Sequence, residues 1–267
     1  MTTKKLKAGT FMGQVQKMRA LSGFTLSRTD HGQHMKVPKH EHEHPYISLL
    51  LHGLYHEQSI ISEHDIKTGS SLFRPKGFEH KNEIGSHNSF CFNIEIEKGF
   101  PDKKHYSKIA DYMQFERNNL EIYKIYFGFQ NDFSDELLTL MVEENLHLLF
   151  QHQYAENVSG RAHWVGKIKK EIRFHPEKMY RIDEISHSVH LHPNYFVRKF
   201  KEKTGFTLGE FLLRQRISRG IDLMLHSSKP LTEIAVESGF YDQSHFIRHF
   251  RRFFGTTPSH YRAIVKG

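Results

Sequence analysis

The chain has 267 residues, 37% of them hydrophobic and 25% charged, so it is expected to fold into one large domain or two ordinary ones rather than remain disordered. No apolar run reaches the roughly 20 residues of a membrane helix, and the first residues lack the apolar core of a secretory signal. Cys91 is the single cysteine, which excludes an intramolecular disulfide. We therefore expect a cytoplasmic protein without a membrane partner.

Positive charge is concentrated in the C-terminal part of the chain. From Arg161 onward there are 20 lysines and arginines against 10 aspartates and glutamates, whereas the first 160 residues have 18 against 20. A basic module joined to a near-neutral one is typical of a nucleic-acid-binding protein with a separate second function. A basic face that is merely solvated would give the same counts. Charge alone leaves both interpretations open.

Residues 1–100 alternate short β-branched or aromatic runs with turn signals. The runs are Tyr46–Leu51, Ser59–Ile61 and Phe90–Ile96, and the turn signals are His52-Gly53, Lys67-Thr68-Gly69 and Arg74-Pro75-Lys76-Gly77. Short strands at this spacing predict a β-barrel or a β-sandwich.

Many of the 22 histidines lie in this first part of the chain. His40 and His42 are two residues apart, so on a strand they share one face, and His80 follows at a turn. Three inward imidazoles are candidate ligands for zinc, iron, nickel or copper. Alternatively, they line a ligand pocket or the surface, and we expect no bound metal or cofactor. The neighbouring His44, Glu41 and Glu43 are expected to face solvent.

Helical periodicity follows from about residue 104 to residue 155. One amphipathic stripe is formed by Leu138, Val142, Leu146 and Leu149, and Ser134 is the expected N-cap. Such a helix packs on its own domain or forms a dimer seam, and the pattern allows both. The polar residues 156–163, which include Gly160, are predicted to be a linker.

After the linker the chain is predicted to be helical and to repeat itself. Trp164, Ile168 and Ile172 mark a first helix, and a long helix from Phe211 to Leu225 joins two copies of one unit. The copies are offset by 49 residues at residue 182 and by 50 residues from Phe196 onward. Each has a short helix (182–188 and 231–238), a turn, and a second helix (193–203 and 242–254). This is the helix-turn-helix arrangement, whose second helix enters a major groove of DNA.

The second helices have two distinct faces. Phe196 and Phe200 in one copy, and Phe246 and Phe250 in the other, are expected to lie in the core. The residues predicted to contact base edges are Asn194, Val197 and Arg198 in the first copy and Gln243, Ser244, His245 and Arg248 in the second. Lys199, Lys201, Lys203, Arg251 and Arg252 are expected to contact phosphates. Asp242 and Thr257 are the predicted N-caps, and Pro230 and Pro258 are expected in first helical turns.

Residues 161–267 resemble the DNA-binding domain of the AraC/XylS family of bacterial transcription regulators. The most specific stretch is LTEIAVESGFYDQSHFIRHFRRFFGTTPSHYR, from Leu231 to Arg262. The resemblance implies seven helices, two helix-turn-helix units bridged by the long helix, and recognition helices in successive major grooves roughly 34 Å apart. It places the base contacts on the seven residues named above. The first copy departs from the family pattern because Val189-His190-Leu191 replaces the common turn glycine.

The N-terminal histidines resemble the two motifs of the cupin fold, a small β-barrel. His40-Glu41-His42 and Gly53 fit the first motif, but Tyr46 stands where the family has a glutamate ligand. Gly69, Pro75-Lys76-Gly77 and His80 fit the second motif, with Ile84 in place of its asparagine. Tyrosine is a poor metal ligand because of its high pKa. In AraC-type regulators such a domain often senses the effector and forms the dimer.

Together, these observations predict an α+β multidomain protein. Residues 1–100 would form a cupin-like effector-binding barrel, residues 101–157 a helical dimerisation and linker segment, and residues 158–267 the DNA-binding domain. The expected function is sequence-specific transcription regulation under the control of a small molecule, without enzymatic activity. The expected partners are double-stranded DNA, a small-molecule effector, a second copy of the chain and RNA polymerase. The alternative is a metal-dependent cupin enzyme or a metal sensor fused to a DNA-binding domain.

Overall fold

The computed structural model describes residues 3–97, 112–115, 119–158 and 163–266. The chain divides into two compact units, residues 1–145 and 146–267, and each is described by itself. The expected boundaries at residues 100 and 157 differ from this division, which falls within one long helix. Among the described residues, no helix combines the length and apolar character needed to cross a membrane.

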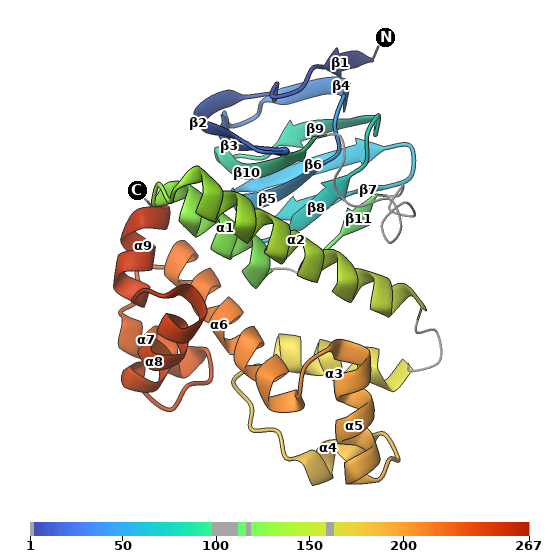
Figure 1. The fold of residues 1–267 in the computed structure, drawn as a ribbon, viewed down its shortest axis with the longest axis vertical. Helices are drawn as coiled ribbons and strands as arrows, with labels where there is room; N and C mark the ends of the chain where they lie inside the picture. Colours follow the sequence, from blue (N-terminus) through green and yellow to red (C-terminus); the bar gives the residue numbers. More distant parts are fainter. Residues whose placement is uncertain (1–2, 98–111, 116–118, 159–162, 267) are drawn as a thin grey trace. The chain divides into compact units, whose positions relative to one another are not determined.

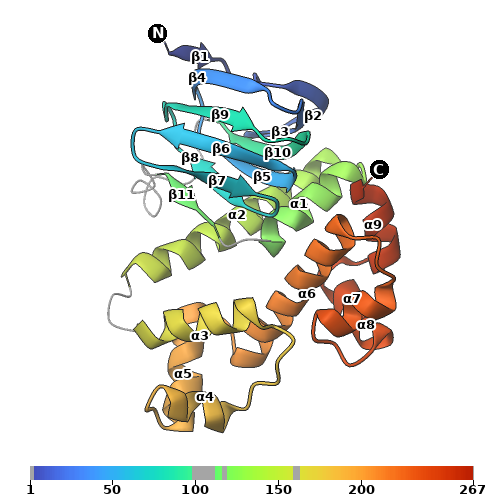
Figure 2. The same cartoon turned by 180° about the vertical axis from the view of Figure 1, so that it is seen from behind.

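The first unit contains two β-sheets that face each other (Figures 1 and 2). One sheet has the strand order β1-β4-β9-β6-β7 and the other the order β11-β8-β5-β10-β3-β2. The strands are β1 (Lys4–Leu6), β2 (Gln14–Leu21), β3 (Phe24–His31), β4 (Lys36–His42), β5 (Tyr46–His52), β6 (Leu54–Ser59), β7 (Glu63–Lys67), β8 (Ser71–Arg74), β9 (His80–Ile84), β10 (Ser89–Ile96) and β11 (Met113–Gln114). The predicted N-terminal β-domain is thereby confirmed.

The run Ser59–Ile61 is not the strand that the sequence predicted. Strand β6 ends at Ser59, and Ile60 and Ile61 are 92% and 63% exposed in the turn before β7. The Ser59 hydroxyl accepts hydrogen bonds from the backbone N–H groups of Ile61 and Ser62. Hydrogen bonds from nearby backbone N–H groups to a serine side chain favour a turn over a continuing strand, despite the β-branched residues.

Two helices follow the sheets. Helix α1 (Leu120–Gln130) begins at the N-cap Asn119, and α2 (Asp135–Val158) begins after Ser134. Aromatic contacts pack α1 on the second sheet, with ring centroids of Phe92 5.1 Å from Tyr126 and 5.4 Å from Phe129. The Ser134 Oγ accepts from the backbone N–H of Leu137 at 3.3 Å, which confirms the predicted cap.

The predicted apolar stripe of α2 is confirmed, while the limits of the helical segment are corrected. All four stripe residues are at most 5% exposed: Leu138, Val142, Leu146 and Leu149. Residues 156–158, predicted as linker, continue α2, because polar residues can remain helical, and residues 159–162 of the predicted linker lie outside the described residues. Residues 113–114 form β11, which pairs with β8 inside the segment expected to be helical.

The second unit is helical, as predicted. Seven helices are described: α3 (His163–Phe174), α4 (Ile182–Ser188), α5 (Pro193–Thr204), α6 (Leu208–His226), α7 (Leu231–Glu237), α8 (Gln243–Phe254) and α9 (Pro258–Lys266). Helix α6 connects the α4–α5 pair to the α7–α8 pair (Figure 1). Pro258 opens α9 as expected, whereas Pro230 is the N-cap residue of α7 and precedes its first turn.

Phenylalanines of the two second helices form the cores, as the sequence predicted. Phe196, Phe200, Phe246 and Phe250 are fully buried. Gly220 of α6 lies so close to the Phe246 ring that a Cβ there would be 2.8 Å from it. This glycine therefore lets α6 and α8 approach each other, and it fixes the position of the second helix-turn-helix unit.

Candidate DNA-binding surface and barrel cavity

The turn between the two helices of each unit has the same backbone geometry in both copies. Gly239 has a φ of 88°, and His190, at the equivalent position, has a φ of 56°. The next residue closes the turn in each copy, since Leu191 N–H donates to Ser186 and Phe240 N–H donates to Ala235, both at 2.9 Å. His190 thus adopts the left-handed conformation for which glycine is common, and the turn is formed without glycine.

The first recognition helix, α5, presents its predicted contact residues in two ways. Asn194 and Arg198 are exposed, with the Arg198 guanidinium 5.7 Å from the centre of the Tyr195 ring. Val197 is half-buried and packs against the core of its unit. Lys199 is half-buried and lies 2.7 Å from the Glu202 carboxylate. Asn194 and Arg198 are therefore the side chains of this face that are freest to meet a ligand.

The second recognition helix, α8, exposes Ser244, Arg248 and Arg251. Gln243 and His245 are half-buried, and the His245 ring packs 5.4 Å from Phe240 and 4.7 Å from His249. The seven predicted base-contacting residues thus lie at the N-terminal ends of α5 and α8, and they differ in exposure. The fold confirms their helices, while their roles remain predictions.

The helix caps hold these N-terminal ends in place. The Asp242 carboxylate accepts from the His245 backbone N–H at 2.7 Å, and the Thr257 hydroxyl accepts from that of His260 at 3.2 Å, as predicted. Helix α5 is capped instead by His192, whose Nδ1 accepts from the Asn194 N–H at 3.3 Å. A capping box of Thr207 and Glu210 before α6 was not predicted, although its spacing is visible in the sequence.

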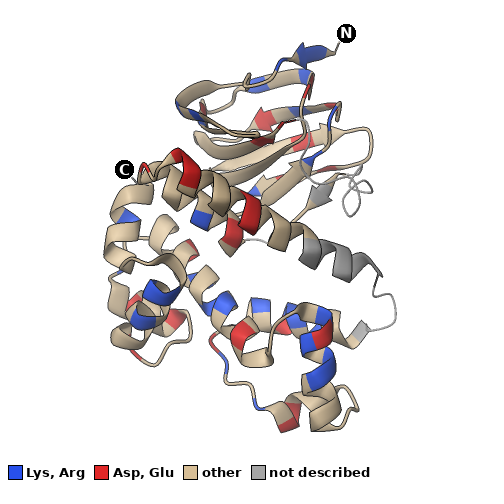
Figure 3. Ribbon diagram, in the orientation of Figure 1, with Lys and Arg blue, Asp and Glu red and all other residues tan. Residues whose placement is uncertain are grey.

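Figure 3 shows lysines and arginines along α5, α6 and α8. At the C-terminal ends of the recognition helices, Lys201, Arg251 and Arg252 are exposed. Cations there are favourably placed relative to the helix dipole and remain available for phosphates. Seven of the 20 lysines and arginines counted from Arg161 onward thus lie on α5 and α8, and the others are spread over the rest of the unit.

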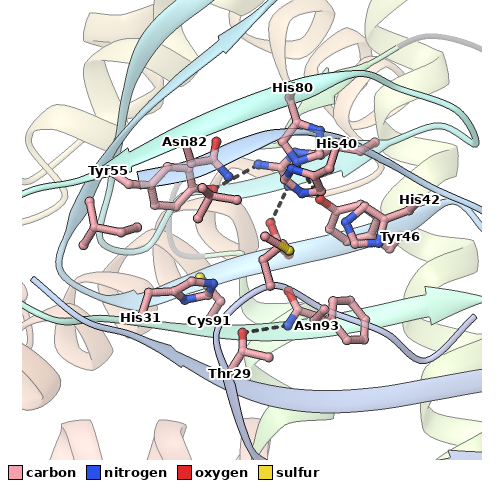
Figure 4. A pocket seen from close by; sticks show the side chains of 16 residues that line it. Thr29, His31, His40, His42, Tyr46, Tyr55, His80, Asn82, Cys91 and Asn93 are labelled. Carbon is pink, nitrogen blue, oxygen red and sulfur yellow. Dashed lines mark hydrogen bonds between the residues drawn. The ribbon is translucent and has the colours of Figure 1, made fainter. Parts of the chain in front are cut away.

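The first unit contains a cavity of about 40 Å³ between its sheets (Figure 4). Its walls are formed by Phe11, Met12, Thr29, His31, Val37, His40, His42, Tyr46, Ser48, Tyr55, Arg74, His80, Asn82, Ile84, Cys91 and Asn93. This volume holds roughly three water molecules, because each requires at least about 10–15 Å³.

The three candidate metal ligands meet in this cavity. One ligand nitrogen of each of His40, His42 and His80 lies within 4.8 Å of the others. The Nδ1 atoms of His40 and His80 contact the backbone carbonyls of Pro38 at 2.9 Å and Phe78 at 3.1 Å. In the tautomers that donate to those carbonyls, the lone pairs of His40 and His80 lie on Nε2, and that of His80 faces the Tyr46 hydroxyl. Burial lowers the pKa of His40 to about 4 and that of His42 to about 3.

Tyr46 occupies the place of the glutamate that the cupin motif would supply. Its hydroxyl lies 3.1 Å from His80 Nε2, and burial raises the Tyr46 pKa above its usual value. The protonated phenol therefore donates to the His80 lone pair. His44, expected to face solvent, is only 21% exposed and its Nδ1 lies 3.0 Å from the buried Glu95 carboxylate. Glu41, also expected to face solvent, is 25% exposed.

An ion pair that the sequence did not reveal lies beside the histidines. Arg74 of β8 and Glu57 of β6 are 2% and 0% exposed. Arg74 donates through Nε and Nη2 to the Glu57 carboxylate, through Nη1 to Ser48 Oγ at 2.7 Å, and through Nη2 to Tyr55 OH at 3.0 Å. A permanent cation in the wall makes the cavity less favourable for a dication and more favourable for a ligand with acceptor atoms.

Comparisons with known proteins agree with the helix-turn-helix geometry. Residues 185–264 match the helix-turn-helix domain family. The probable transcriptional regulator LumQ of Photobacterium leiognathi is 25% identical over 85% of this chain and 92% of its own length. The Msm operon regulatory protein of Streptococcus mutans is 28% identical, but the match spans 49% of this chain and 46% of that protein.

Among solved structures, ToxT of Vibrio cholerae has a TM-score of 0.40 and 16% sequence identity, with 92% of this chain and all of that chain covered. Residues 185–264 therefore form a helix-turn-helix domain, in agreement with the resemblance of the C-terminal part to the AraC/XylS family, and the relatives that share it are named as transcription regulators.

Proposed function

We propose that this protein regulates transcription by reading a specific DNA sequence, and that a small molecule in the N-terminal barrel controls it. The observation that supports this most strongly is the repeated presentation of exposed polar residues at the start of α5 and of α8, above buried phenylalanines. Such a helix start is the part that meets base edges in a major groove. A regulator of bacterial DNA would act in the cytoplasm, as the sequence analysis expected.

Within this proposal, the two arginines have the most specific roles. Arg198 and Arg248 would each donate two hydrogen bonds to a guanine, since both are exposed at the same position of their helices. Asn194 and Gln243 would read adenine, while Val197, Ser244 and His245 would make the remaining base contacts. Lys199 and Arg251 would contact phosphates, which add affinity without sequence information.

Selection of preferred sites from a random DNA pool tests these roles. Arg248→Ala is expected to lose preference at one or two base positions by about 1–3 kcal/mol, which is roughly 5- to 150-fold. Arg252→Ala is the matched control, because Arg252 is exposed on the same helix but one turn further along. It should weaken binding to all sequences alike and lower the slope of log affinity against log salt by about 1. An unchanged preferred sequence in Arg248→Ala would contradict the reader role.

Control by an effector requires that effector binding in the barrel and DNA binding by the C-terminal unit shift the same conformational equilibrium. A homodimer would support this, since it places up to four recognition helices on DNA and increases avidity. Leu137, Leu140 and Leu148 of α2 are 45%, 59% and 37% exposed, which makes α2 the proposed dimer seam. Sedimentation of Leu140→Asp should show monomer where the unaltered protein shows dimer. RNA polymerase is the further partner that such a regulator would contact at a promoter.

A metal-responsive regulator is the second candidate, because the structure brings His40, His42 and His80 together. Three neutral imidazoles suit zinc or nickel, and these residues would hold the ion. The fit is incomplete, since no carboxylate belongs to the cluster and Arg74 lies beside it. Elemental analysis of protein purified without a histidine tag would show stoichiometric metal that His42→Ala loses and His44→Ala keeps. Metal-free protein with unchanged DNA affinity in the presence of chelator would exclude this candidate.

A further inference from the structure

The barrel cavity is too small for an ordinary effector, but a larger groove adjoins it. The groove has a volume of about 520 Å³, within the range of roughly 300–1,000 Å³ for small-molecule sites. Its lining includes Gly13, Gln14, Asp30 and His31. The cavity inside the barrel has about 40 Å³. An effector larger than a few atoms therefore needs the groove, the movement of a side chain, or both.

His31 lines both spaces. On β3 it is two residues from Thr29, so both side chains point to the interior. On the neighbouring strand β10, Cys91 pairs with Thr29 and Ser89 pairs with His31. His31 and Cys91 are therefore diagonal neighbours on one face of the sheet. Figure 4 shows them together on the side of the cavity away from the cluster of His40, His42 and His80.

The His31 ring lies between the two spaces, packed on Gly13 and near the backbone of Met12 and Ser89. Its Nδ1 is buried without a hydrogen-bond partner in the described part of the chain, and so is Oδ1 of the adjacent Asp30. Asp30 Oδ1 lies 3.6 Å from Arg28 Nε, an ion pair without a hydrogen bond. A buried polar atom without a hydrogen bond costs about 1–3 kcal/mol, so both atoms favour a ligand that donates hydrogen bonds. Gly13 packs against the ring, since a Cβ at this position would be 2.8 Å from His31 Cδ2. Burial lowers the pKa of His31, so the ring is neutral and can move without moving a charge.

We propose that the effector enters the barrel through this groove and that the His31 side chain must swing aside for it to pass. The proposal rests on the effector control proposed above. The bound effector would be a small molecule with N–H or O–H donors, which would satisfy Asp30 and His31 in the groove while one end reaches the interior. His31 is then the residue that sets the size of ligand that the barrel admits.

The single cysteine provides a probe of this route that requires neither the effector nor DNA. Cys91 lines the inner cavity and is 7% exposed, and burial raises its pKa to about 12. Its reaction with methyl methanethiosulfonate, followed by mass spectrometry, reports how often the cavity opens. His31→Ala should accelerate labelling by about tenfold or more, since tenfold corresponds to about 1.4 kcal/mol in the opening equilibrium. His87→Ala is the matched control, because His87 is exposed in the neighbouring loop and lines neither space.

A second pair of variants tests the groove itself. Gln14 is exposed and lines the groove, so Gln14→Trp should fill it and slow labelling in the native and His31→Ala backgrounds alike. Gln16→Trp, at an exposed position outside the groove, should leave the rate unchanged. Labelling rates at low urea concentrations distinguish local opening from global unfolding. Only labelling through global unfolding becomes faster with urea as steeply as the whole protein unfolds.

Equal labelling rates in His31→Ala and native protein would overturn the proposal, as would a rate that follows global unfolding. An unchanged labelling rate in Gln14→Trp would also overturn the proposal. This second test remains valid if His31→Ala does not fold. Effector control of transcription is measured separately, by DNA affinity, so either idea can fail while the other stands.

Discussion

The buried ion pair in the barrel allows a quantitative prediction. Glu57→Gln keeps the size of the side chain but removes the negative charge that faces the Arg74 guanidinium. Both side chains are at most 2% exposed, so bulk water cannot take over the role of the carboxylate. The remaining Arg74 bonds, to Ser48 and Tyr55, are made to neutral oxygens. The substitution therefore leaves a buried cation without its counter-charge.

The expected cost follows from this environment. Removing one partner of a buried ion pair typically costs about 3–5 kcal/mol, which is a large part of the roughly 5–15 kcal/mol that stabilises a domain. For a domain of about 150 residues, each kcal/mol shifts the Tm by roughly 2–4 °C. Glu57→Gln should therefore lower the Tm of the N-terminal unit by roughly 6–20 °C. Glu63→Gln is the matched control, and it should shift the Tm little because Glu63 is 58% exposed.

Calorimetry of the full chain, with DNA binding as a separate check on the C-terminal unit, measures this cost. The double variant Glu57→Leu with Arg74→Met should recover most of the lost stability, because replacing a buried pair with apolar residues is often neutral or stabilising. A Glu57→Gln protein as stable as the native one would refute the reasoning. So would a double variant that is less stable than the single one, since the uncompensated charge would then not be the cause.

Two further predictions concern the cores. Burial lowers the pKa values of His40 and His42 to about 4 and 3, so at mildly acidic pH the unfolded chain binds more protons than the folded one. The free energy of unfolding should therefore fall as the pH drops from about 6.5 toward 4, by up to about 1.4 kcal/mol per pH unit for each histidine. Urea midpoints at pH 7, 6 and 5 measure this, and His42→Asn should reduce the slope. In the second unit, Phe250→Ala should cost about 3–5 kcal/mol in urea unfolding, and Phe253→Ala, which is half-exposed, clearly less; equal costs would contradict the assigned core.

The sequence predicted the C-terminal unit well because its signals are local and occur twice. Helix α4 has the predicted limits, and the helices α5 and α8 differ from theirs by one residue at one end. The N-terminal unit was harder to predict for two physical reasons. Strand β2 is mostly exposed and polar, so its sequence lacks the expected alternation. Helix α1 is buried on nearly all sides, so it shows no amphipathic stripe.

The site shows the same division between local and non-local information. The proximity of His40 to His42 was predictable, because residues two apart on one strand lie on the same face. The meeting of Arg74 with Glu57 was not, because it depends on which strands of two sheets face each other. His31 has no motif around it, and its place between the cavity and the groove follows only from the register of β3 and β10.

The two recognition helices also differ at their N-terminal caps, and this difference has consequences for DNA. Helix α8 begins with the Asp242 carboxylate, which neutralises the positive end of the helix dipole and would repel a phosphate. Helix α5 begins with His192, which brings no carboxylate and caps at a longer distance, so its first N–H groups remain more attractive to an anion. We therefore expect a phosphate contact at the start of α5 and base contacts alone at the start of α8. Ethylation interference on a selected site would locate the contacted phosphates, and strong interference at both helix starts would contradict this asymmetry.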